Sequence, residues 1–231
     1  MNIYRYVVQY DGGTAPRPFG DVCSLAICKP MIRRTASLGD WIIGVRSRRN
    51  DQVVYVMQVD EILPFDQYWS DSRFEDRRPG ASLVPDNIYR TSASGTLVQV
   101  ENIVHDVSNI ANDLSGRNVL LGRRFWYFGS SSPDLPDNLK HLKPYCRGHS
   151  VHINRRHGDA DIRELESWLE SIPGGIHDVP IDATEKLRAL LSNSKQSANG
   201  SSTEATRAVG CTPRLAIGDS QTNRPRTKCV R

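Results

Sequence analysis

The sequence predicts an α+β fold in which a mostly antiparallel, barrel-like sheet is combined with a few short helices. Three observations lead to this class. Short runs rich in β-branched and aromatic residues outnumber the helical patterns. Most of these runs follow one another through short polar turns, as strands of hairpins do. Helical segments do not alternate regularly with strands, which argues against a parallel βαβ winding.

The clearest hairpin covers residues 41–59. Trp41–Val45 and Val53–Val59 are apolar, β-branched runs, and the polar segment Arg46–Asp51 joins them. A turn at 38–40 precedes the first run, with glycine supplying the unusual dihedral angles. Before that turn, Pro30 ends the preceding segment, and we expect a basic polar linker that contains Arg33 and Arg34.

Other strands and helices follow from the same patterns. Further strands are expected at Ile3–Tyr10, Leu97–Val100, Asn118–Leu121 and Arg124–Phe128, while Val22–Cys28 is a strand or a short buried element. Pro64 ends a strand and a short helix follows over 65–69. The spacing of apolar residues in Asp159–Ile172 predicts an amphipathic helix. Asn102–Leu114 fits a loop or a helix, and Ala183–Leu191 is expected to add a last short helix.

Three segments differ in composition. We expect a β-rich core domain over 1–145, a helical extension over 146–191 and a disordered basic tail, rich in Ser, Asn and Thr, over 192–231. The net charge of the chain is +4, but the segment from Ala189 onward carries +5 and the rest carries −1. The overall basicity therefore belongs to the tail and does not indicate that the folded part binds nucleic acid.

The spacing of the cysteines and the absence of a phosphate-binding motif argue against a bound metal or cofactor. Five scattered cysteines, with no leader or long apolar segment before them, favour a reduced, cytoplasmic compartment without membrane contact. Cys146, His149, His152 and His157 approach ligand spacing but lack a second well-spaced pair, so we expect no metal. Cys23 and Cys28 fit small buried cysteines. No phosphate-binding glycine motif is present, and we expect no cofactor.

Several motifs occur in the order found in one known family. They are Phe19-Gly20, Cys23-Ser24-Leu25-Ala26, Cys28-Lys29-Pro30, Ile32-Arg33-Arg34, Gly39-Asp40-Trp41, Gly44, Tyr55, Phe65-Asp66-Gln67-Tyr68-Trp69, Phe74 and Asp86-Asn87-Ile88-Tyr89. With them the chain resembles the nucleotide modification associated domain 2 family, from the N-terminus to about Gly129 and more weakly to Tyr145. The resemblance implies a role in phage or bacterial systems that modify bases in DNA or handle modified nucleotides.

A looser resemblance connects residues 39–41 and 53–59 with PUA-like and EVE-like barrels. It implies a PUA-like sheet with an aromatic-lined pocket for a modified base. The ring faces would come from Trp41, Tyr55, Trp69 and Tyr89, the base-edge contacts from Asp86 and Asn87, and the phosphate contacts from Lys29, Arg33 and Arg34. Aromatic residues at strand and helix spacing are also typical of a core, so packing is the alternative for each of them.

Three functions remain open on the sequence alone. The first is recognition of nucleotides or modified bases in a DNA-modification or phage-defence system, with a nucleotide or nucleic acid as partner. The second is an enzyme that transfers or hydrolyses a group on a base or nucleotide, with Asp40, Asp86 or His105 as acid–base candidates. His105 has a neighbouring carboxylate in Asp106, but adjacent residues of a strand point to opposite faces. The third is an interaction protein that binds nucleic acid through its basic tail; the sequence names no protein partner.

Overall fold

A computed structural model describes residues 1–144, 149–153 and 159–185. The expected tail and most of the expected helix at 183–191 lie outside these residues, as do Cys146 and His157. Within them the α+β class is confirmed: the strands form mixed sheets and the helices are short. None of the described helices is long and apolar enough to cross a membrane.

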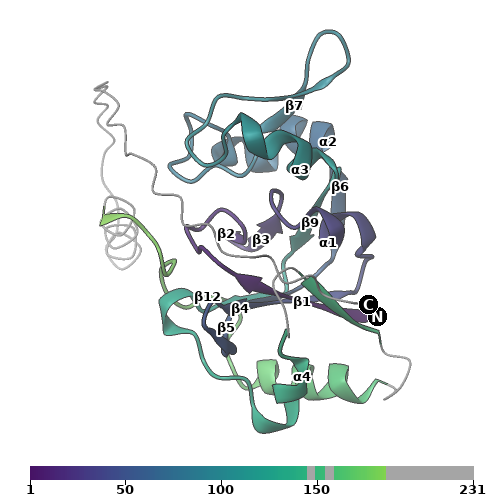
Figure 1. The fold of residues 1–231 in the computed structure, drawn as a ribbon, viewed down its shortest axis with the longest axis vertical. Helices are drawn as coiled ribbons and strands as arrows, with labels where there is room; N and C mark the ends of the chain where they lie inside the picture. Colours follow the sequence, from purple (N-terminus) through teal and green to yellow (C-terminus); the bar gives the residue numbers. More distant parts are fainter. Residues whose placement is uncertain (145–148, 154–158, 186–231) are drawn as a thin grey trace, which may run out of the picture.

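The largest sheet has six strands in the order β11-β1-β4-β5-β10-β12 and runs across the middle of the molecule (Figure 1). Its strands are β11 (His149–Ile153), β1 (Asn2–Val8), β4 (Trp41–Arg46), β5 (Arg49–Gln58), β10 (Phe125–Tyr127) and β12 (Gly175–Ile176). β1 pairs in parallel with β4, and β10 with β12, whereas the remaining pairs are antiparallel.

A second, antiparallel sheet has the order β2-β3-β9-β6, and a separate ribbon pairs β7 with β8. Their bounds are β2 (Arg17–Phe19), β3 (Val22–Leu25), β9 (Asn118–Gly122), β6 (Glu61–Pro64), β7 (Tyr89–Thr91) and β8 (Leu97–Gln99). No closed barrel forms among the described strands, so the barrel-like, PUA-like closure stays a prediction.

Short helices pack around the two sheets. The α-helices are α1 (Pro30–Thr35), α2 (Phe65–Ser70), α3 (Ile110–Leu114) and α4 (Ala160–Glu170), and the 3-10 turns are η1 (Ser72–Arg77), η2 (Val107–Asn109), η3 (Gly129–Ser131) and η4 (Asp137–Leu142). In Figure 1, α2, α3 and β7 lie together at one end of the molecule and α4 lies across the six-stranded sheet at the other.

Three apolar clusters hold these layers together. One joins the two larger sheets and includes Tyr6, Tyr55 and Leu120. A second packs α4, through residues such as Leu165, against the opposite face of the six-stranded sheet. The third lies between the four-stranded sheet and α2. The apolar face predicted for 159–172 is therefore the face that is buried, as expected for an amphipathic helix on a sheet.

Most predicted elements are found near their predicted positions. The strands expected at 3–10, 97–100, 118–121 and 124–128 correspond to β1, β8, β9 and β10, and the hairpin corresponds to β4 and β5. Its strands extend further toward the tip than the apolar pattern does, since β5 begins at Arg49. Backbone pairing does not require apolar side chains, so polar residues at the end of a hairpin can extend the ladder.

One local prediction is wrong. Residues 30–35 were expected to be a polar linker, but they form α1, with Pro30 in its first turn. Proline is well suited to this position because its fixed φ is helical and its missing N–H would have no partner within the helix. The 102–114 segment, which the sequence left open, contains both alternatives: a loop followed by η2 and α3.

We predict that Gly122→Ala destabilises the fold where the two larger sheets approach. A Cβ at Gly122 would lie 2.4 Å from the carbonyl oxygen of Gln58, so backbone must move. The free energy of unfolding should fall by about 2 kcal/mol, as for overpacked cores. Chemical denaturation measures this. Gly174→Ala is the matched control, because its Cβ would lie 3.5 Å from the carbonyl oxygen of Phe125, and it should shift stability by less than about 0.5 kcal/mol.

Candidate active site

Cys28 has a left-handed backbone conformation, which residues other than glycine rarely adopt. It follows β3 and precedes α1, with φ 58°, and the next residue, Lys29, has φ 41°. Two consecutive left-handed residues with side chains cost conformational energy, and such residues are concentrated at functional sites. The conformation is held from both sides. The Cys28 N–H donates to Asp113 Oδ1 at 2.8 Å, and Arg33 Nε donates to the Cys28 carbonyl at 2.7 Å.

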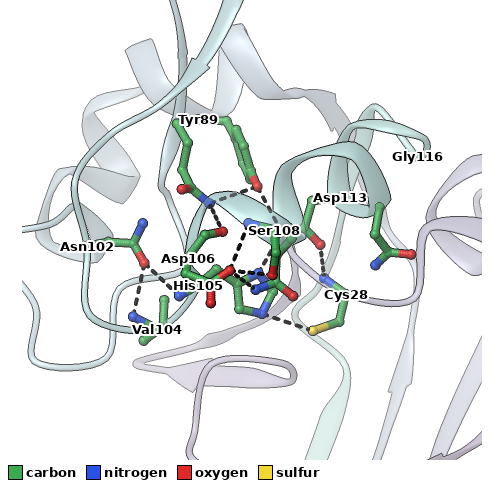
Figure 2. A network of polar contacts seen from close by, with 12 residues as sticks. Cys28, Tyr89, Asn102, Val104, His105, Asp106, Ser108, Asp113 and Gly116 are labelled. Atoms are coloured by element: carbon green, nitrogen blue, oxygen red, sulfur yellow. Dashed lines mark hydrogen bonds and ion pairs between the residues drawn. The ribbon is translucent and has the colours of Figure 1, made fainter. Parts of the chain in front are cut away.

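His105 connects Cys28 to Asp113 (Figure 2). Its Nδ1 lies 2.6 Å from Asp113 Oδ2, and its Nε2 lies 3.4 Å from Cys28 Sγ. Because a carboxylate accepts, the Nδ1–H donates to Asp113 and Nε2 is left facing the sulfur. The loop that carries His105 is fixed by Asn102, whose Oδ1 accepts from the N–H groups of Val104 and His105. The result is a continuous chain of thiol, imidazole and carboxylate.

Asp113 is fully buried and surrounded by donors. Besides His105 and the Cys28 N–H, its carboxylate accepts from the Tyr89 hydroxyl at 3.0 Å. Gln99 in turn donates to the Tyr89 oxygen at 3.1 Å. The Arg33 guanidinium lies 4.0 Å from Asp113 Oδ1 and donates to the Asp113 backbone carbonyl at 2.6 Å. These hydrogen bonds and the nearby guanidinium stabilise the buried Asp113 carboxylate. They also fix its orientation toward His105.

The electrostatic balance favours a protonated His105. Burial by itself lowers the pKa of the imidazole, but the hydrogen bonds to Asp113 and Cys28 and their negative charges outweigh it and raise the pKa of His105 to about 10. His105 is therefore an imidazolium at neutral pH.

A cavity of about 780 Å³ opens on this chain. Cys28 and His105 line it, together with apolar and aromatic side chains such as Tyr6, Tyr10 and Leu83. Asp113 does not line the cavity and lies behind His105. Cys28 and His105 thus belong to the cavity wall, while Asp113, which orients the imidazole, is shielded from solvent.

The same three residues include the donor types of a metal site. Cys28, His105 and Asp113 offer ligand atoms within 4.8 Å of one another. Both Asp113 oxygens already accept hydrogen bonds from the protein, and His105 Nδ1 faces Asp113. Only Cys28 Sγ and His105 Nε2 remain, whereas zinc sites use three or four protein ligands. The donor set fits a thiol–imidazole pair better than a resident metal.

The carboxylates predicted as acid–base groups lie away from this cavity. Asp40 accepts from the N–H groups of Asn2 and Ser37, at 2.7 and 3.0 Å, and so closes the turn before β4. Asp86 is buried with Ser24, Tyr68 and Arg77; burial raises its pKa, and the charge of Arg77 opposes the rise. A catalytic role for Asp40 or Asp86 stays a prediction. His105 is the predicted acid–base candidate that lies in the cavity wall.

The predicted phosphate contacts occupy different environments. Lys29 lines the cavity, and Arg34 is exposed on α1. Arg33 is fully buried and donates to the carbonyls of Cys28, Asp113, Gly116 and Asn118. Its burial lowers its pKa to about 10, against the opposing charge of Asp113. A ligand could reach the Arg33 guanidinium only by replacing these bonds.

The predicted ring faces and base-edge groups are mostly packed in the protein. Trp41, Tyr55 and Tyr89 are fully buried. Trp69 is partly exposed, with the Arg78 guanidinium 4.9 Å from its ring centre. Asn87 donates to the carbonyls of Tyr68 and Phe74 from a buried position. None of these residues lines the cavity, and their role in binding stays a prediction.

Sequence reasoning missed Cys28 as a nucleophile and Asp113 as the partner of His105. The neighbouring Asp106 turns away and accepts from the Ser108 N–H at 2.8 Å, beginning η2. No periodicity relates 28, 105 and 113. The available signal was chemical: a cysteine and a histidine in a chain expected to be reduced are candidates for a nucleophile and its base.

We predict that His105 makes the free energy of unfolding depend on pH. Its pKa in the folded state, about 10, lies above the unfolded value of about 6.5. Its contribution is therefore complete below pH 6.5 and is lost as the pH rises to 10. Denaturation of the native protein and of His105→Gln should differ most at pH 6, with the gap narrowing toward pH 10. A gap independent of pH would contradict the pairing with Asp113.

Comparison with known proteins adds one match. The family model of the nucleotide modification associated domain 2 matches residues 1–187, which includes every residue of the site described above. No curated protein and no solved structure gives a significant match to the chain. The matched segment extends past the region of resemblance seen in the motifs and covers most of the sequence. The chain therefore belongs to the nucleotide modification associated domain 2 family.

Proposed function

We propose that this protein is an enzyme that transfers or hydrolyses an acyl group in a nucleotide-modification system, with Cys28 as nucleophile. The observation that carries the proposal is the Cys28–His105–Asp113 chain at the wall of a cavity. A thiol, an imidazole that faces it and a carboxylate that fixes the imidazole are the parts of cysteine-based acyl transfer. Cys28 and His105 are the catalytic residues, and Asp113 is a positioning residue.

Each step can be assigned to an atom of the chain. Cys28 Sγ, as thiolate, forms a bond to the carbonyl carbon of the substrate. As the tetrahedral adduct collapses, the bond to the leaving amine or alcohol breaks, and that group takes the proton of His105 Nε2. The neutral imidazole then removes a proton from water or from an acceptor amine. This acceptor attacks the thioester carbon and releases the Cys28 thiolate, so both groups return to their starting states.

The family supports a nucleotide or a modified base as the molecule that carries the acyl group or receives it. The cavity volume of about 780 Å³ is within the range of small-molecule sites and is large enough for a nucleoside. Tyr6 and Tyr10 in its lining could contact a base. Under this proposal, the protein first binds the nucleotide or modified base and then transfers or hydrolyses the acyl group.

Recognition without turnover, the other function considered from the sequence, would not require the arrangement at Cys28. A strained cysteine, a histidine aligned on it and a buried carboxylate are costly to hold together. A binding pocket gains nothing from this cost, whereas a covalent mechanism needs it. The geometry therefore favours the enzyme.

We predict that Cys28 is unusually reactive toward the neutral electrophile iodoacetamide at pH 7. It should react at least about tenfold faster than glutathione, because an imidazole faces its sulfur at 3.4 Å, the arrangement that activates a cysteine nucleophile. Peptide mass spectrometry locates the product, and Cys23, which is fully buried, should remain unmodified in the native protein. Asp113→Asn should slow the reaction about tenfold or more by releasing the imidazole. Asp106→Asn is the matched control and should leave the rate unchanged. Modification of Cys28 no faster than glutathione would contradict the proposal.

We also predict turnover of N-acylated nucleotides. The protein would be incubated with the 5′-monophosphates of N-acylated cytidine and adenosine, with and without an acceptor amine, and the products identified by mass spectrometry. Release or transfer of the acyl group should depend on Cys28, and Cys28→Ser should lower the rate by about a thousandfold or more. Cys23→Ser, a matched substitution in the core, should retain turnover. Turnover that survives Cys28→Ser would assign the chemistry to another group.

A further inference from the structure

Lys29 follows Cys28 in the chain and lines the same cavity. Its left-handed backbone (φ 41°, ψ 49°) sends the side chain back toward β1. There its Nζ lies 4.6 Å from the centre of the Tyr6 ring and donates to the carbonyl of Val7 at 3.4 Å. The ammonium is therefore held against the protein, at the cavity, by a ring face and one carbonyl.

Lys29 has no acidic partner in the described part of the chain. No carboxylate of the described residues lies within 4.0 Å of its Nζ, whereas the buried Arg33 has Asp113 at that distance. Burial lowers the pKa of Lys29, with the negative charge of Cys28 opposing the change. A largely buried ammonium that no carboxylate of the described residues contacts is unfavourable, and binding of an anion would relieve that cost.

Apart from His105, whose Nε2 faces the Cys28 sulfur, the cavity lining described here contains one cation. Lys29 is the only Lys or Arg among the described residues that line it. Arg33 is occupied by backbone carbonyls, and Arg34 is exposed, with its guanidinium against Met31 Sδ. A triphosphate or a long stretch of nucleic-acid backbone would require several cations. One lysine matches one anionic group.

On the basis of the proposed function, we infer that Lys29 binds a single anionic group of the substrate, a carboxylate or a phosphate monoester, next to the carbon that Cys28 attacks. The substrate class is thus an acyl compound with one anionic group: either the acyl group carries a carboxylate or the nucleotide carries one phosphate. Lys29 acts as a specificity residue and takes no part in bond making.

Two alkylating agents that differ in charge test the inference without a known substrate. Iodoacetate is anionic and iodoacetamide is neutral, and both alkylate a thiolate. The ratio of their rates at Cys28 should fall about fivefold or more in Lys29→Met, because the attraction for the anion is lost in a partly desolvated site. Arg34→Met, which removes an exposed cation from α1, the helix that directly follows Lys29, should leave the ratio at its native value. Thermal melts establish that both variants are folded.

The outcomes separate this inference from the proposed function. Fast reaction of Cys28 with iodoacetamide together with an unchanged ratio in Lys29→Met would overturn the role of Lys29 alone. Slow reaction of native Cys28 with iodoacetamide would overturn the nucleophile, on which this inference rests. His105 is present in both variants, so its charge cancels from the comparison.

Protection experiments then distinguish the two sources of the anion. Glutarate and cytidine 5′-monophosphate would be tested for slowing the iodoacetamide reaction at Cys28, with glutaramide and cytidine as neutral controls. Protection by glutarate, lost in Lys29→Met, identifies a carboxylate. Protection by the monophosphate and not by cytidine, also lost in that variant, identifies a phosphate. Protection by neither anion beyond its neutral control would overturn the subsite.

Discussion

The buried carboxylate of Asp113 is the group on which the candidate site depends. It lies on α3, yet it accepts hydrogen bonds from the segment after β3, from β7 and from the loop before η2. Arg33 on α1 supplies the opposite charge and donates to the backbone around it. Taking Asp113 out of water is unfavourable unless all these donors are present, and this requirement fixes their relative positions. One interaction therefore sets the distance between sulfur and imidazole as well as the packing of α1 against α3.

The same contacts explain how the chain maintains a strained cysteine. Cys28 and Lys29 would leave their left-handed conformations if their backbone groups were free. The Cys28 N–H and carbonyl are instead both bound to side chains, those of Asp113 and Arg33. Because of this, the sulfur points at His105 and the lysine folds back over Tyr6. Reactivity at Cys28 and recognition at Lys29 would then be consequences of one local backbone geometry.

A second buried carboxylate shows what distinguishes this site from a purely structural network. Asp86 is also fully enclosed, with Ser24 and Tyr68 as donors and Arg77 nearby. Its network ties η1 to the four-stranded sheet, but none of these four residues lines the cavity. Asp113 has equally complete bonding, and in addition it orients a histidine that does reach the cavity. The Asp113 network therefore differs from the Asp86 network because it includes a residue in the cavity wall. Burial of a carboxylate is common to both.

The sequence by itself determined the local structure: the α+β class, the β4–β5 hairpin, the apolar face of α4 and the family were all readable because they depend on short-range periodicity or on ordered motifs. It also placed His105 among the acid–base candidates and Lys29 among the anion contacts. It gave the wrong structure for 30–35, where proline begins a helix instead of excluding one. Only the tertiary structure decided that Cys28 faces His105 and that Asp113, not Asp106, orients it. Cys28 and His105 are 77 positions apart in the chain, and His105 and Asp113 are 8 positions apart. Their contact depends on how α1, α3 and the loop before η2 pack around a buried ion pair, and no periodicity of the sequence indicates that packing.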